Sequence, residues 1–247
     1  MNKMSQIMRL DKYISSQRSD LSRSQVKELC KKGKVTVDGE IVKKSDAKLD
    51  ADKAVVCVNG EAISYRRHIY IMLNKPQGVV CSTRDGLSPT VLSLIPPHLQ
   101  RDGLFPAGRL DKDTEGFVLI TDDGDFAHRI LSPKNHIPKT YYVELEKPYD
   151  DSYGEKFENG ITLRTGEQCM SAQFIPTDDK KKCYVVLHEG MFHQVKKMFE
   201  ALSNKVVFLK RTRMGSLDLD ENLALGECLE LMHKEVCKIA PLFDDGF

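Results

Sequence analysis

Residues 108–116 have the sequence Gly108-Arg109-Leu110-Asp111-Lys112-Asp113-Thr114-Glu115-Gly116, in a chain of 247 residues. An apolar run at residues 117–121 follows them and has the composition of a buried β-strand. Two glycines bracket an arginine and three acidic side chains, so we expect a loop that presents charged groups from a rigid strand. A catalytic carboxylate positioned by the neighbouring arginine is one interpretation of this loop.

Two other interpretations of the loop stay open at this point. A solvated turn with internal ion pairs would have the same composition. Four acidic residues between Asp111 and Asp122 also fall at the ligand positions of a calcium-binding loop. The last of them is Asp rather than the longer Glu, and Pro106 prevents a regular entering helix. Calcium is therefore disfavoured, and we expect no metal.

The chain around this loop predicts many strands and few helices. We expect strands at residues 69–73, 117–121, 140–145, 183–187, 205–209 and 228–231, and helices at 126–131, 151–158 and 192–202. Phe192, Val195 and Phe199 recur at helical spacing, which predicts that all three face the core. Strands do not alternate regularly with long helices, so the pattern favours an α+β domain with a mixed or antiparallel sheet.

Residues 1–67 differ from the rest of the chain in charge. They hold 15 Lys and Arg against 9 Asp and Glu, whereas the other 180 residues hold 22 against 27. Ser22 and Gln25 form a capping-box pattern before a helix, and Asp-Gly and Asn-Gly pairs at 38–39 and 59–60 predict hairpins. These features indicate a small basic module that binds a polyanion, although a solvated charged face would look the same. We place the domain boundary between residues 67 and 68.

Several classes of function lack their sequence signals. No phosphate-binding P-loop, dinucleotide fingerprint or serine-hydrolase elbow occurs. His188 and His193 are five residues apart, which would place them on different sides of a helix and disfavours zinc. The seven cysteines contain no Cys-x-x-Cys pair, and no apolar run is long enough to cross a membrane. We expect an intracellular protein without disulfides.

Taken together, these segments resemble the pseudouridine synthase family. Residues 108–124 resemble its central motif, residues 73–78 its first catalytic-domain motif, residues 139–141 its tyrosine motif and residues 189–199 its third motif. Residues 9–58 resemble an S4 RNA-binding domain. The motifs occur in the order typical of the family. Residues 76–83 and 122–133 are most similar to the branch that acts on small-subunit (16S) rRNA.

The resemblance implies an α+β protein with an S4-like RNA-binding domain at residues 1–67 and a pseudouridine synthase catalytic domain at residues 68–247. Its activity would be the isomerisation of a specific uridine in 16S rRNA to pseudouridine, with base flipping and without a cofactor. Alternatives are a synthase of large-subunit (23S) rRNA and a non-catalytic RNA-binding ribosome-assembly factor. A second carboxylate at Asp113 or Asp122 would instead fit a nucleoside hydrolase. The expected protein is a cytoplasmic monomer that acts on 16S rRNA or the assembling small subunit, without membrane contact.

The resemblance also implies roles for individual residues. Asp111 would be the catalytic carboxylate, with Lys196 as its cation and Tyr141 stacking on the uracil or acting in proton removal. The expected substrate-binding side chains are Asn74, Lys75, Arg109, His193 and Gln194. The expected phosphate contacts of the S4-like domain are Arg9, Lys12, Arg23, Lys27, Lys31 and Lys32.

Overall fold

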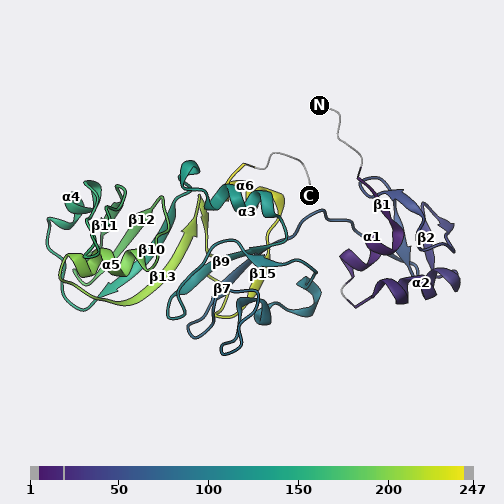
Figure 1. Cartoon of the computed structure of the whole chain (residues 1–247), viewed down its shortest axis with the longest axis horizontal. Helices are drawn as coiled ribbons and strands as arrows, with labels where there is room; N and C mark the ends of the chain where they lie inside the picture. Colours follow the sequence, from purple (N-terminus) through teal and green to yellow (C-terminus); the bar gives the residue numbers. More distant parts are fainter. Residues whose placement is uncertain (1–5, 19, 242–247) are drawn as a thin grey trace. The chain divides into compact units, whose positions relative to one another are not determined.

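A computed structural model describes residues 6–18 and 20–241 of the chain. Within these residues, the chain folds into two compact units. One comprises the residues up to His68 together with Pro96–Gly103, and the other comprises Ile69–Ile95 and the residues from Leu104 onward. Figure 1 shows the elements of both units.

The first unit contains two helices and two small antiparallel sheets. Its elements are β1 (Ile7–Arg9), α1 (Leu10–Gln17), α2 (Arg23–Lys31), β2 (Val35–Val37), β3 (Glu40–Ile41), β4 (Lys48–Asp50), β5 (Val56–Val58), β6 (Glu61–Ile63) and the 3-10 helix η2 (Pro97–Leu99). The sheets have the orders β3-β2-β5-β6 and β1-β4. Apolar side chains of α1 and α2 pack on these strands; Leu10, Ile14 and Val26 are fully buried.

Local signals set the ends of α2 and the hairpins as predicted. Ser22 Oγ accepts a hydrogen bond from the Gln25 backbone N–H, and the Gln25 side chain accepts one from the Ser22 backbone N–H. The capping-box prediction is therefore confirmed. Asp38-Gly39 joins β2 to β3 and Asn59-Gly60 joins β5 to β6, all with the positive φ angles that such tight turns require.

The second unit is built on a sheet of nine strands. These are β7 (Tyr70–Lys75), β8 (Phe105–Pro106), β9 (Glu115–Thr121), β10 (Lys139–Leu145), β11 (Gln173–Pro176), β12 (Lys182–Leu187), β13 (Val206–Met214), β14 (Leu217–Asp218) and β15 (Cys228–Glu230). The order is β11-β12-β10-β13-β9-β7-β15, with β14 paired to β13 and β8 to β9. The β13–β9 pair is parallel, whereas the other ladders described for this sheet are antiparallel. The predicted α+β fold with a mixed sheet is confirmed.

Each half of this sheet has its own helices. They are α3 (Gly124–Leu131), α4 (Tyr153–Glu158), α5 (Gln194–Ala201), α6 (His233–Ile239), η1 (Val91–Leu94) and η3 (Pro133–Asn135). In Figure 1, α3 and α6 lie beside β9, and α4 and α5 lie beside β10–β12. Phe126 of α3 and Val236 of α6 join one buried cluster with Phe117 of β9. Phe157 of α4 and Phe199 of α5 pack together at a ring distance of 5.2 Å.

The two halves meet where β9 and β13 run side by side. Their pairing is short and joins Glu115 to Lys210 and Gly116 to Arg211. Gly116 has φ +103°, and a Cβ added there would lie 2.2 Å from the Arg211 carbonyl oxygen. Only glycine permits this approach. The loop that precedes Gly116 therefore emerges at the seam between the two halves of the sheet.

The last predicted helix begins later than expected. α5 starts at Gln194, because His193 adopts a left-handed conformation with φ +53°. Phe192 therefore lies outside the helix, and 70% of its surface is exposed. The prediction that Phe192 shares the buried face of this helix is wrong. No helix among the described residues has the length and apolar character needed to cross a membrane.

Candidate active site and basic groove

A buried lysine holds the loop that carries Asp111. Lys75, at the end of β7, is 0% exposed, and its ammonium group donates to the carbonyl oxygens of Thr114 (2.7 Å), Pro76 (3.0 Å) and Lys112 (3.4 Å). Burial lowers the pKa of Lys75, against the attraction of nearby anionic groups. The substrate contact expected for Lys75 stays a prediction, and in this structure the buried side chain fixes the loop.

Asn74 is also buried, in β7, and its side-chain amide donates to the Leu223 carbonyl oxygen at 2.7 Å. Its backbone N–H donates to the Glu227 carbonyl oxygen at 3.1 Å. Asn74 thus ties β7 to the segment before β15, and its expected substrate contact stays a prediction.

The Asp111 carboxylate lies between two side chains from the region of α5. Its Oδ2 is 3.1 Å from Lys196 Nζ, and its Oδ1 is 3.3 Å from His193 Nε2. The side chains of Asp111 and Lys196 are 23% and 18% exposed, so water weakens this interaction less than it would at an open surface.

Lys196 has a second carboxylate partner that the sequence did not predict. Asp113 Oδ1 lies 2.6 Å from Lys196 Nζ, closer than the Asp111 oxygen. Burial opposes the charge on Lys196, but hydrogen bonds and charges from Asp113 and Asp111 outweigh it and raise the pKa of Lys196. The hydrogen bond from Lys196 lowers the pKa of Asp113, against a smaller effect of burial. Both partners of this pair are therefore ionised near neutral pH.

Asp111, rather than Asp113, faces a cavity. The cavity has a volume of about 80 Å³ and is lined by Arg109, Leu110, Asp111, Thr114, Tyr141, Leu187, Gly190, Met191, His193, Gln194, Val195 and Leu209. Lys196 and Asp113 are not among these lining residues. The structure thus brings one carboxylate, one exposed arginine, a tyrosine and a histidine to a hollow with apolar walls.

Strand register and a local turn position the other cavity residues. Tyr141 on β10 pairs with Val185 on β12 and with Arg211 on β13, which places it at the seam of the sheet. Gln194 is buried; its side chain donates to Glu189 Oε1 at 2.5 Å and accepts from the Met191 N–H at 3.0 Å. Gln194 therefore braces the turn at residues 189–194, in addition to lining the cavity.

Several cavity residues have no distinctive sequence signal. Leu187 and Leu209 are ordinary strand residues that reach the cavity through the pairing of β12, β10 and β13. Outside the cavity, buried Cys81, 29 positions before Leu110, accepts a hydrogen bond from the Leu110 N–H at its sulfur. Asp113, also outside the cavity, was marked in the sequence only as one of the acidic residues of the loop.

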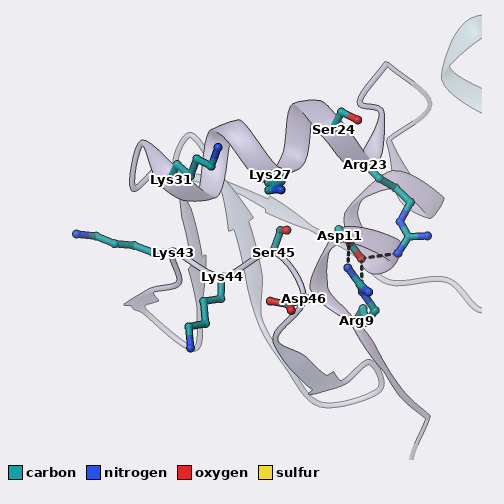
Figure 2. Close-up of a pocket in the computed structure, with 10 residues that line it drawn as sticks. All are labelled: Arg9, Asp11, Arg23, Ser24, Lys27, Lys31, Lys43, Lys44, Ser45 and Asp46. Atoms are coloured by element: carbon teal, nitrogen blue, oxygen red, sulfur yellow. Dashed lines mark hydrogen bonds and ion pairs between the residues drawn. The ribbon is translucent and has the colours of Figure 1, made fainter.

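A second hollow lies in the first unit and is strongly basic. Figure 2 shows its lining residues, Arg9, Asp11, Arg23, Ser24, Lys27, Lys31, Lys43, Lys44, Ser45 and Asp46, around a groove of about 570 Å³. Buried Asp11 accepts hydrogen bonds from Arg9 at 2.7 Å and Arg23 at 3.0 Å. Burial raises the pKa of Asp11, but the two guanidinium groups outweigh it and lower the pKa overall. Asp11 thereby fixes both arginines at one side of the groove.

The predicted phosphate-binding residues divide into two sets. Arg9, Arg23, Lys27 and Lys31 line the groove. Lys12 and Lys32 are exposed but are not among its lining residues. The structure adds Lys43 and Lys44, which line the groove from the segment between β3 and β4. Their signal in the sequence was a basic pair after a short strand, which by itself indicates only a charged surface.

Known proteins match this chain over most of its length. The family described as RNA pseudouridylate synthase matches residues 69–201, and the S4 domain family matches residues 8–55. A Bacillus subtilis (strain 168) protein, "Uncharacterized RNA pseudouridine synthase YtzG", is 44% identical and covers 93% of this chain and 97% of its own length. "Ribosomal small subunit pseudouridine synthase A" of Vibrio cholerae is 42% identical, covering 94% of this chain and 99% of its own length. Its namesake in Escherichia coli (strain K12) is 40% identical, with coverages of 94% and 100%.

A solved structure agrees with these matches. The crystal structure of a pseudouridylate synthase has a TM-score of 0.66 and 40% sequence identity to this chain. It covers 94% of this chain and 99% of its own. The similarity therefore includes both units.

Proposed function

This chain belongs to the RNA pseudouridylate synthase family and carries an S4 domain, and from that premise we propose that it isomerises a specific uridine of small-subunit (16S) rRNA to pseudouridine. The rRNA assignment is supported by relatives named ribosomal small subunit pseudouridine synthase A, which match nearly the whole chain at 40–42% identity. We assign residues 1–67 to RNA binding and residues 68–247 to catalysis. The proposed partner is 16S rRNA, free or in an assembling small subunit.

The observation that carries the proposal is the Asp111 carboxylate at the cavity, beside Lys196 and His193. The reaction breaks the C1′–N1 bond of uridine, turns the base and joins C5 to C1′. Asp111 would either attack C1′ or remove the 2′ proton of the sugar, and each route requires an ionised carboxylate next to the sugar. The Lys196 ammonium group lies 3.1 Å from this carboxylate and holds it at the cavity.

Two further residues have the positions that the proposed reaction needs. Tyr141 is buried in the cavity wall, where its ring would stack on the uracil or its hydroxyl would act in proton removal at C5. Arg109 is exposed and lines the cavity, so its guanidinium group would hold a phosphate of the extruded nucleotide or fill the stack it leaves. Because the cavity is small, the target base must leave the RNA stack to reach Asp111.

The arrangement of carboxylates supports an isomerase over a nucleoside hydrolase. Glycoside-cleaving hydrolases generally place two carboxyl groups about the scissile bond. Here the Asp113 side chain is 70% exposed, is bound to Lys196 and does not line the cavity. Asp122 accepts a hydrogen bond from the Ile69 backbone N–H and does not line it either. Asp111 is the one carboxylate among the lining residues.

The basic groove supports the choice of an RNA substrate. Its six Arg and Lys side chains outnumber its two Asp residues, which suits a phosphate backbone. One chain supplies every group of the cavity, so we propose that the enzyme acts as a monomer, in the cytoplasm where rRNA is assembled into subunits.

The test is pseudouridine formation on 16S and 23S rRNA that lacks the modification, mapped by chemical modification and reverse-transcriptase stops. We expect one stop in 16S rRNA with wild type and none with Asp111→Asn, which should still bind the RNA. Asp113→Asn is the matched control: it removes a carboxylate from the same lysine but not from the cavity, and the stop should remain. A stop in 23S rRNA alone would change the substrate. Tight binding with no stop on either RNA would identify an assembly factor.

A further inference from the structure

We infer that Phe192 is a stacking platform for the base of a nucleotide that flanks the target uridine; this inference rests on the proposed function. The Phe192 side chain is 70% exposed and does not line the Asp111 cavity. Its ring lies parallel to the His193 ring, with a centroid distance of 3.8 Å and an interplanar angle of 20°. His193 lines the cavity, and its Nε2 is 3.3 Å from Asp111 Oδ1. Phe192 therefore lies at the rim of the cavity, where its ring stacks on the His193 ring that contacts the Asp111 carboxylate.

A fixed turn, rather than a frayed helix end, exposes Phe192. His193 has φ +53°, a left-handed conformation that is uncommon for a non-glycine residue and is concentrated at functional sites. Gln194 closes the turn by accepting a hydrogen bond from the Met191 N–H at its side chain, while its own N–H donates to the Met191 carbonyl oxygen. Gln194 is buried, so the turn is anchored in the fold. The exposed position of Phe192 follows from this geometry.

The small volume of the cavity indicates which nucleotide contacts the Phe192 ring. At about 80 Å³ it is far smaller than the 300 Å³ or more of a typical small-molecule site. A space of this size suits one extruded nucleotide rather than a longer stretch of RNA, so the nucleotides on either side lie outside the cavity. Extrusion of the target also deprives its neighbour of a stacking partner. An exposed aromatic ring at the rim replaces that partner.

The chemistry next to the ring suits RNA better than another protein. Bases stack on aromatic side chains whatever the sequence, because every base has a π-face. Lys197 Nζ lies 5.2 Å from the centroid of the Phe192 ring, so a cation is available beside the base for its phosphate. An isolated exposed phenylalanine would be ordinary at a protein surface. Phe192 differs because it stacks on the residue that contacts Asp111.

Kinetics on a 16S rRNA fragment containing the mapped uridine test this role. Base–aromatic stacking predicts that Phe192→Ala raises KM about 5- to 20-fold, toward the lower part of the range for stacked bases, with a smaller change in kcat. Phe192→Tyr and Phe192→Trp should restore KM. Phe192→Leu, which keeps an apolar side chain but no π-face, should not. A purely structural role predicts the opposite order, with Leu close to wild type and Trp impaired.

Fluorescence provides a readout independent of turnover, because the chain contains no tryptophan. In an Asp111→Asn background, Phe192→Trp should be quenched when the RNA fragment binds, and an abasic residue at one flanking position should abolish the quenching. Val207→Trp, at an exposed site on β13 four residues before Arg211, is the matched control and should not respond.

The outcomes separate the inference from the proposed function. If wild type modifies 16S rRNA but Phe192→Leu matches its KM, or abasic flanks leave the Phe192→Trp quenching unchanged, the stacking role is overturned and the enzyme assignment stands. If wild type modifies no rRNA, no target uridine is mapped, and the proposed function and the stacking role that rests on it are both overturned.

Discussion

Replacing Gly116 by alanine tests whether the close approach of β9 and β13 holds the catalytic unit together. Gly116 has φ +103°, and an added Cβ would lie 2.2 Å from the Arg211 carbonyl oxygen and 2.8 Å from the Arg211 nitrogen. Both contacts are with backbone, so no flexible side chain can move aside. This pair is also half of the short parallel ladder that joins the two parts of the sheet.

The expected loss has two parts. Positive φ costs a residue with a Cβ about 1–2 kcal/mol. Real Cβ atoms essentially never approach closer than 3.0 Å, so the strands must separate by about 1 Å and weaken their hydrogen bonds. Each weakened bond costs about 0.5–1.5 kcal/mol. Together these effects lower the free energy of unfolding by about 3 kcal/mol, a large part of the roughly 5–15 kcal/mol of a typical domain.

Urea unfolding followed by circular dichroism measures this loss, and Gly124→Ala provides the matched control. Gly124 begins α3 with no neighbouring atom within 4 Å of an added Cβ and no positive φ, so alanine there should be neutral or stabilising by less than about 1 kcal/mol. A Gly116→Ala variant within 1 kcal/mol of wild type would refute the argument that the seam requires glycine.

Three further predictions concern buried and exposed lysines. Lys75→Met removes the hydrogen-bond donor to three loop carbonyl oxygens. In single-turnover assays kcat should therefore fall at least 10-fold, while RNA affinity changes little. An unchanged kcat would contradict the role of Lys75 in fixing the loop. Burial, with a contribution from Arg211, lowers the pKa of Lys139 from 10.5 to about 8. As the pH rises from 8 to 10.5, the folded state has lost this proton while the unfolded state still binds it, so the free energy of unfolding of wild type should increase. Lys139→Met should lack this increase, and in urea unfolding at pH 7 it should be more stable than wild type by up to about 3 kcal/mol. The same pH dependence of stability in both proteins would disprove the effect of Lys139. Lys43→Ala should reduce the slope of log K against log salt for RNA binding by about 1. The control is Lys34→Ala, which replaces an exposed lysine outside the groove and should leave the slope unchanged. Equal slopes for the two variants would show that Lys43 does not contact the RNA.

The features that the sequence predicted well depend on neighbours close in the chain. The capping box from Ser22 to Gln25 spans four residues, and the turns at Asp38-Gly39 and Asn59-Gly60 span two. Short apolar runs likewise predicted the main strands, and their order relative to the helices predicted a mixed or antiparallel sheet. Such signals are local because capping bonds and turn angles involve only a few consecutive residues.

Motif order along the chain identified the family, but only the tertiary structure assigned positions to the polar residues within those motifs. Lys75 and Arg109 are both basic residues in motifs, yet packing buries one against three carbonyl oxygens and leaves the other exposed at the cavity. Phe192 followed a helical spacing, and the left-handed backbone of His193 turned it outward. Periodicity cannot detect a single residue of unusual φ.

The sequence by itself determined the α+β class, the local turns and caps, and the identity of Asp111 as the candidate carboxylate. The tertiary structure decided that Asp111 and not Asp113 faces the cavity, and that Lys196, 85 residues further along the chain, binds both. It also decided that Lys43 and Lys44 line the same basic groove as Lys27 and Lys31 of α2. The physical reason is that burial and charge pairing depend on distances in space, which are set by strand register and packing between segments far apart in the chain.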